Sequence, residues 1–205
     1  MKNLKKYIIE SIFDIEDNID NIDESIKDQI KQFLNNNFTI SSKYEISKKP
    51  NKDGKFEVSS TGDVEAKNKL IISLTNELFI WTNIKGNFYC DDCNYCSSLI
   101  SLEGAPEKVS GKFNCNSCHS LTSLEGAPKE VGGDFNCNGC ESLISLKGAP
   151  EKVGGGFSCN YCKSLKSLKG APKEVRKNFS CQYCGVEFTE KDVKNVSNVK
   201  GMIKV

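Results

Sequence analysis

The fold is decided by the stretch Val131–Leu146, which reads VGGDFNCNGCESLISL. Closely similar stretches lie 22 residues before it and 22 residues after it, and one further copy lies on each side of these three. A fixed period of about 20–50 residues is typical of architectures in which each unit buries its apolar face against its neighbours. The sequence therefore predicts a stacked repeat of five coils, in which the following phenylalanines share one column: Phe88, Phe113, Phe135, Phe157 and Phe179.

Each repeat contains a short stretch in which apolar and polar residues alternate. Phe135 and Cys137 alternate with Asn136 and Asn138, and this period of two predicts a β-strand with Phe135 and Cys137 facing the core. Stacked coils place equivalent strands about 4.8 Å apart and so form a parallel sheet. We expect the leucines that follow to fill the next wall, and Val153 to face inward on a far wall. The two glycines after Val153 are expected to permit a sharp turn into the next strand.

The spacing of the inward residues resembles the leucine-rich repeat. Phenylalanine and cysteine replace two of its leucines, and the sequence Gly-Ala-Pro replaces its usual turn. The resemblance implies a mainly β, right-handed solenoid of short parallel strands, with an extended rather than helical opposite side. The repeat is also similar to proteins of tailed phages of gut bacteria. The residues that match the L-x-L-x-x-(N/C)-x-x-L-x-x-L pattern are Phe135, Cys137, Cys140, Leu143 and Leu146.

Sequence outside the repeats predicts a cap at each end of the solenoid. An apolar stripe from Ile22 to Leu34 indicates an amphipathic helix, and alternating residues on both sides of Pro50–Gly54 indicate a β-hairpin. Thr189 followed by Asp192 is typical of a helix N-terminus. The first regular coil carries three extra residues, and the sequence leaves their place within 88–96 open. We therefore expect a basic peptide and acidic linker over 1–21, a helix and hairpin cap over 22–61, a solenoid over 62–188 (degenerate coil 62–87, five coils 88–188) and a helical cap over 189–205.

Cysteine pairs of the form C-x-x-C recur once per coil. Two such pairs that converge are a strong zinc signal, because tetrahedral zinc takes four ligands. Here each pair occupies the same column of a stacked repeat, where cysteine serves as a small buried residue. We expect a structural ladder of reduced thiols and no cofactor, since eleven cysteines occur without a secretory signal. The alternative is a zinc-binding module at the insertion, with the ligands Cys90, Cys93 and Cys96.

The composition argues against several classes of function. A net charge of +1 gives no field that would draw the chain to nucleic acid or to a membrane surface. No apolar run is long enough to span a bilayer, and the N-terminus lacks the apolar segment of a secretory signal. The sequence shows no acid–base pair and no phosphate-binding loop, so we predict that the protein is not an enzyme.

The polar positions of the strands and two nearby tyrosines are the candidate binding surface for a protein partner of unknown identity. Aromatic residues are frequent anchors at protein interfaces. Charge also changes along the repeats, from Glu103 and Glu125 to Lys147 and Lys169. Opposite-signed ends would favour head-to-tail association of two copies. The candidate partner-binding residues are Asn114, Asn116, Asn136, Asn138, Asn160, Tyr161 and Tyr183.

The first eleven residues resemble the capsid-targeting peptide of internal head proteins in T-even-like phages. They begin Met-Lys, carry Tyr7, and continue with Ile-x-Glu and a small residue. The resemblance implies cleavage by a prohead protease after Glu10, with a second candidate site at Glu24. It also implies a cargo protein packaged in the virion head, and otherwise located in the cytoplasm of the infected bacterial host.

Overall fold

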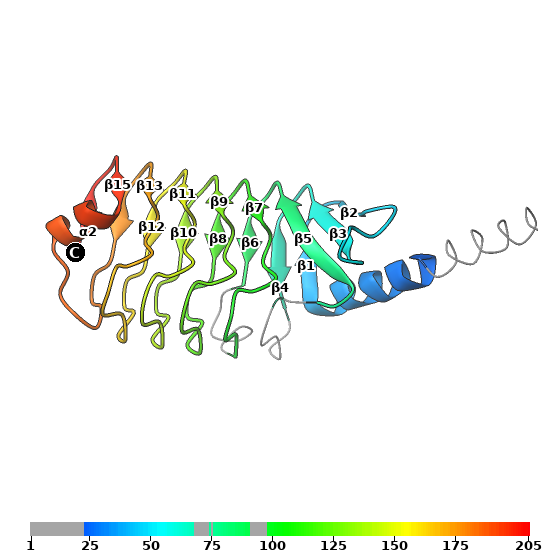
Figure 1. The fold of residues 1–205 in the computed structure, drawn as a ribbon, viewed down its shortest axis with the longest axis horizontal. Helices are drawn as coiled ribbons and strands as arrows, with labels where there is room; N and C mark the ends of the chain where they lie inside the picture. The colour runs from blue at the N-terminus through cyan, green and yellow to red at the C-terminus, as the bar shows by residue number, and fades with distance from the viewer. Residues whose placement is uncertain (1–22, 68–73, 75, 91–97) are drawn as a thin grey trace, which may run out of the picture.

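The protein is a mainly β solenoid of about six turns, with a helix near each end of the chain. The computed structural model describes residues 23–67, 74, 76–90 and 98–205. In Figure 1 the coils form an elongated stack, with the N-terminal helix at one end and α2 at the other. The repeat period thus predicted the architecture, because each coil covers the apolar edge of the one before it.

Two eight-stranded sheets run along the stack. One, here called the phenylalanine sheet, has the order β1 (Phe38–Ile40), β4 (Val64–Ala66), β6 (Phe88–Tyr89), β8 (Phe113–Asn114), β10 (Phe135–Asn136), β12 (Phe157–Ser158), β14 (Phe179–Ser180) and β16 (Ile203–Lys204). The other, here called the valine sheet, has the order β15 (Asn198–Val199), β13 (Glu174–Val175), β11 (Lys152–Val153), β9 (Glu130–Val131), β7 (Lys108–Val109), β5 (Phe79–Ile84), β3 (Phe56–Ser60) and β2 (Tyr44–Ile46).

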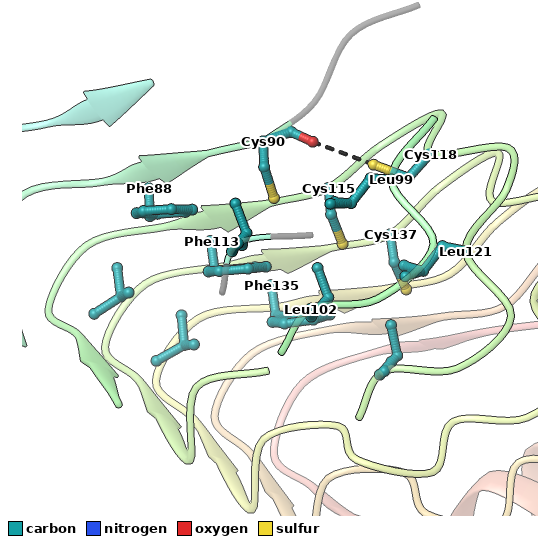
Figure 2. Packing of buried hydrophobic residues seen from close by; sticks show 14 of the residues in the cluster. Phe88, Cys90, Leu99, Leu102, Phe113, Cys115, Cys118, Leu121, Phe135 and Cys137 are labelled. Carbon is teal, nitrogen blue, oxygen red and sulfur yellow. Dashed lines mark hydrogen bonds between the residues drawn. The ribbon is translucent and has the colours of Figure 1, made fainter. Parts of the chain in front are cut away.

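The strands of the regular coils pair in parallel and in register, so that equivalent residues form columns. Phe135 pairs with Phe113 on one side and with Phe157 on the other. The phenylalanine rings stack along the core with centroids 5.5, 5.2, 5.4 and 5.1 Å apart from Phe88 to Phe179. Figure 2 shows this column beside the buried cysteines and leucines of the same coils. Each aromatic contact adds about 0.5–1.5 kcal/mol beyond the burial of its area.

Glycine allows a close backbone approach where two of the middle coils pass from the valine sheet to the phenylalanine sheet. A Cβ added to Gly154 would lie 2.2 Å from the carbonyl oxygen of Gly132 in the preceding coil, and Gly132 has the same relation to Ser110. The sequence predicted glycine here for a sharp turn. The chain does bend at Gly154 and Gly155, and the structure adds a second constraint, the close approach of successive backbones. Positive φ occurs one turn earlier, at Gly148 (φ 88°) in the Gly-Ala-Pro segment.

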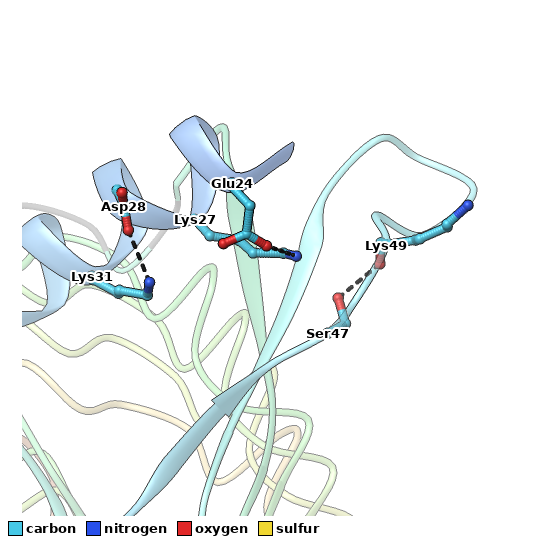
Figure 3. Close-up of polar contacts among 6 residues, drawn as sticks. All are labelled: Glu24, Lys27, Asp28, Lys31, Ser47 and Lys49. Atoms are coloured by element: carbon cyan, nitrogen blue, oxygen red, sulfur yellow. Dashed lines mark hydrogen bonds and ion pairs between the residues drawn. The ribbon is translucent and has the colours of Figure 1, made fainter. Parts of the chain in front are cut away.

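Antiparallel strands and a helix end the stack on its N-terminal side. The described helix covers residues 23–37 and buries Ile30 and Leu34 against the first coil. The predicted hairpin is present, with β2 antiparallel to β3, and β1 lies antiparallel to β4. Lys27 packs over the ring of Phe56 at 5.7 Å while its amine pairs with Glu24 at 2.7 Å. Figure 3 shows this pair beside Lys31–Asp28 and the Ser47–Lys49 turn, so the helix and the hairpin meet on one side of the molecule.

A short helix, as predicted, and a last strand form the C-terminal cap. Helix α2 (Glu190–Val196) begins with a capping box between Thr189 and Asp192 and buries Val193. Strand β16 then adds Ile203 beneath Phe179 in the phenylalanine sheet. In the part of the chain that the structure describes, neither helix has the length and apolar content to cross a bilayer.

Candidate functional site

The second cysteine of each pair links successive coils. Its thiol donates a hydrogen bond to the backbone carbonyl of the first cysteine in the coil before, 3.2 Å away for Cys118, Cys140 and Cys162 and 3.3 Å for Cys184. Figure 2 shows the first of these bonds, from Cys118 to Cys90. No disulfide forms among the nine described cysteines, as a ladder of reduced thiols requires. The side chains therefore satisfy buried carbonyl groups that the strands leave without a partner.

The first cysteine of each pair is buried deeply enough to suppress its chemistry. Hydrogen bonding with Cys140 and burial hold the pKa of Cys115 well above its ordinary value, and Cys162 and burial do the same for Cys137. Burial raises the pKa of Cys181 to about 12. Since the thiolate is the nucleophilic form of cysteine, these thiols are poor candidates for a nucleophile.

Metal ligands do not gather in the described part of the chain. Within residues 23–67, 74, 76–90 and 98–205, no three His, Cys, Asp or Glu side chains are placed to hold an ion. Cys90 is buried in the first regular coil, whereas Cys93 and Cys96 lie outside the described residues. Zinc binding by this cluster therefore stays a prediction.

Three of the asparagines predicted to bind a partner hold the coils together. The side-chain carbonyl of Asn116 accepts the backbone N–H of Asn138, that of Asn138 accepts the N–H of Asn160, and that of Asn160 accepts the N–H of Gln182, each at 2.8 Å. Asn138 also accepts a 2.6 Å bond from the hydroxyl of Ser158. All of these side chains are half-buried. The recurrence of asparagine at one position of successive repeats was the signal for this ladder.

The other two predicted asparagines, Asn114 and Asn136, lie on strands β8 and β10 and face outward. The side-chain carbonyl of Asn114 accepts the N–H of Asn116 in its own coil. Asn136 lines a shallow hollow on the phenylalanine sheet. Asp134 and Gly156 also line it, and the glycine has no side chain that could fill it. The Gly156 N–H bonds the carboxylate of Asp134 and lowers the pKa of that group. This hollow is polar and open.

Tyr161 and Tyr183 are brought together at one turn of the coil. Their rings are nearly parallel, 13° apart in orientation, with centroids 4.9 Å apart. Tyr161 remains 54% exposed and Tyr183 68% exposed. Both residues have positive φ, 59° and 56°, and so lie in the left-handed region. The tyrosine pair, as we call these two residues, is the one large aromatic surface that the described chain presents to solvent.

Hydrogen bonds between coils accompany the left-handed conformation at three of the four equivalent positions. The backbone N–H groups of Ser117, Gly139 and Tyr161 donate to the carbonyls of Asn138, Asn160 and Gln182 in the following coils, at 2.7–2.9 Å. Ser117 and Gly139 have φ of 58° and 69°, so the conformation belongs to the turn and not to the tyrosines. The sequence identified the tyrosines but not their backbone. Glycine at position 139 was the available sign of a positive φ.

The graded charges pair along the stack. Lys147 bonds Glu125 at 2.8 Å, and Lys163 bonds Glu141 at 2.7 Å, in each case across one coil. The carboxylate of Glu125 raises the pKa of Lys147, and Lys163 lowers the pKa of Glu141. These contacts neutralise part of the charge difference between the two ends of the repeats. Head-to-tail association, for which that difference was the argument, stays a prediction.

The two candidate processing sites are placed differently. Glu10 lies outside the described residues. Glu24 is exposed near the start of the described helix and pairs with Lys27. Proteases favour exposed flexible loops, so the helix would have to unwind for cleavage after Glu24.

Comparison of the chain with protein-family models, with curated proteins and with solved structures finds no significant match.

Proposed function

We propose that the chain is a non-enzymatic scaffold that binds another protein through the tyrosine pair. The observation that carries this proposal is an exposed, stacked pair of aromatic residues held in left-handed backbone. The partner's identity is left to experiment.

The tyrosine pair is not what the coil itself requires. A left-handed conformation costs an ordinary L-residue about 1–2 kcal/mol, and glycine or asparagine adopts it most easily. Serine and glycine occupy the position in the two preceding coils, which have the same fold. Tyr161 and Tyr183 stay largely in solvent and add little to the core. Exposed tyrosines on a rigid surface are frequent centres of binding energy in protein interfaces.

The scaffold suits this role because the turn is fixed before any partner arrives. Both sides of the turn are tied to neighbouring coils, through the asparagine ladder and through the cysteine ladder that includes Cys162 and Cys184. Surfaces that are already ordered lose less conformational entropy on binding.

Affinity capture from cells that express the chain tests the proposal. Wild-type protein and the double variant Tyr161→Ser/Tyr183→Ser are compared by quantitative mass spectrometry. The matched control is Ile144→Thr, which removes an apolar side chain that is 60% exposed at a different turn and introduces the residue found at Thr122. Support requires a partner that the double variant loses and the control keeps. Equal recovery by all three proteins would overturn the proposal.

We further propose a phage setting, in which this scaffold is packaged in the head. The support is the resemblance of the first eleven residues and of the repeats to phage proteins. Mass spectrometry of purified virions is expected to find the protein with a new N-terminus after Glu10. Its absence from virions, or an intact Met1, would count against packaging and leave the binding proposal untouched.

A further inference from the structure

Beside the tyrosine pair, one coil lacks a side chain at the equivalent position. Ser117, Gly139, Tyr161 and Tyr183 occupy this position in four successive coils, with φ between 56° and 69°. The two tyrosine rings stack across one coil spacing with centroids 4.9 Å apart, and the buried phenylalanine rings stack at 5.1–5.5 Å. One coil spacing therefore accommodates one aromatic ring. The place above Gly139, here called the empty rung, has the thickness of such a ring.

The empty rung is bounded by Tyr161 on one side and by Ser117 on the other. A Cβ added to Gly139 would meet the hydroxyl oxygen of Ser117 at 3.4 Å, and its three nearest atoms all belong to Ser117. Tyr161 stays 54% exposed although Tyr183 stacks on one of its faces. Its other face is thus directed to the coil that carries Gly139. The glycine leaves that face uncovered, where the repeat geometry would otherwise place a third ring.

We infer that the empty rung receives an uncharged aromatic side chain of the partner protein. The inference deepens the proposed function and rests on it. A planar ring inserted there would continue the stack of Tyr161 and Tyr183, an arrangement that aromatic pairs favour. Glu141 and Lys163, two positions beyond Gly139 and Tyr161, neutralise each other at 2.7 Å. Because neither charge dominates beside the rung, an aromatic ring fits the site better than an arginine guanidinium.

NMR titration tests directly whether the empty rung binds an aromatic side chain. The isotope-labelled full chain is titrated with a blocked peptide, acetyl-Gly-Gly-Trp-Gly-Gly-amide. The control peptide carries leucine in place of tryptophan. The tryptophan peptide is expected to shift the amide signals of Gly139 and Tyr161 upfield, through the ring current, with the weak affinity of a single stacked contact. Equal shifts with both peptides, or none with either, would overturn the inference.

A matched pair of variants separates filling of the rung from disturbance of its backbone. Gly139→Tyr places a third ring over the glycine, and Tyr161 and Tyr183 show that the turn accepts tyrosine at this φ. Gly139→Ala adds the same backbone restriction without a ring. The tryptophan peptide is expected to lose its shifts at Tyr161 with Gly139→Tyr and to keep them with Gly139→Ala. Loss with both variants would contradict insertion above residue 139.

The same variants distinguish this inference from the proposed function. If Tyr161→Ser/Tyr183→Ser loses the captured partner while Gly139→Tyr retains it, the proposed scaffold function stands. Insertion of an aromatic side chain of the partner into the empty rung is then refuted. If both variants retain the partner, both proposals fail. Sedimentation velocity at rising concentration is expected to show a monomer. A dimer that Gly139→Tyr abolishes would assign the rung to a second copy and overturn the choice of a separate partner.

Discussion

Replacement of Asn138 by alanine tests whether the asparagine ladder holds the coils together. The side-chain carbonyl of Asn138 accepts two bonds from the next coil, from the N–H of Asn160 at 2.8 Å and from the hydroxyl of Ser158 at 2.6 Å. A typical hydrogen bond contributes about 1 kcal/mol net, so Asn138→Ala should reduce the free energy of unfolding by about 2 kcal/mol. For a chain of this size that loss corresponds to about 4–8 °C in Tm.

The neighbouring asparagine supplies the control. Asn136 lies on the same outward face two residues earlier, and among the described residues its side chain makes no hydrogen bond. Asn136→Ala should therefore change the free energy of unfolding by less than about 0.5 kcal/mol. Urea unfolding followed by circular dichroism measures both variants, with the fluorescence of Trp81 as a second probe. Equal losses for the two variants would refute the assignment of the ladder to Asn138.

Three further predictions concern the turn, acid stability and metal. Gly154→Ala should destabilise the protein by about 1–3 kcal/mol in urea, because its Cβ would lie 2.2 Å from the Gly132 carbonyl; an unchanged midpoint would contradict the close approach. The hydrogen bond from Gly156 lowers the folded-state pKa of Asp134, so its stabilisation is present above the unfolded pKa and is lost as pH falls through the folded pKa. Asp134→Asn should weaken that acid dependence of Tm, and an unaltered pH profile would argue against it. Metal analysis should find less than about a tenth of an equivalent of zinc; one equivalent that Cys93→Ser removes would establish the alternative zinc module.

The parts of the fold that depend on periodicity could be predicted from the sequence. Phe135 and Cys137 face the core as their period of two required, and Thr189 begins the C-terminal helix as its capping pattern required. Both signals are local, since they depend on residues that are neighbours in the chain. Gly154 lies at the bend that the sequence predicted, but its close contact with the preceding coil was not predicted. Its constraint comes from the carbonyl of a residue one coil away.

The candidate site was less predictable because its residues differ in contacts between coils and not in type. Asn136 and Asn138 are the same amino acid on the same face, yet Asn138 bonds the next coil and Asn136 does not. Tyr161 was recognised as an aromatic candidate, but tyrosine gives no sign of a left-handed backbone. In that conformation the Tyr161 N–H donates to the Gln182 carbonyl, 21 residues further on in the chain.

The most direct test of the account is the affinity of the captured partner for the tyrosine-pair variant, measured by calorimetry beside wild type. Loss of one residue at the centre of an interface costs about 2 kcal/mol or more, so even one such loss in Tyr161→Ser/Tyr183→Ser should weaken binding by at least about thirtyfold. Its circular dichroism spectrum should match wild type, because the core does not depend on these side chains. An unchanged Kd together with a lower Tm would show that the pair only stabilises the coils, and would contradict the central claim.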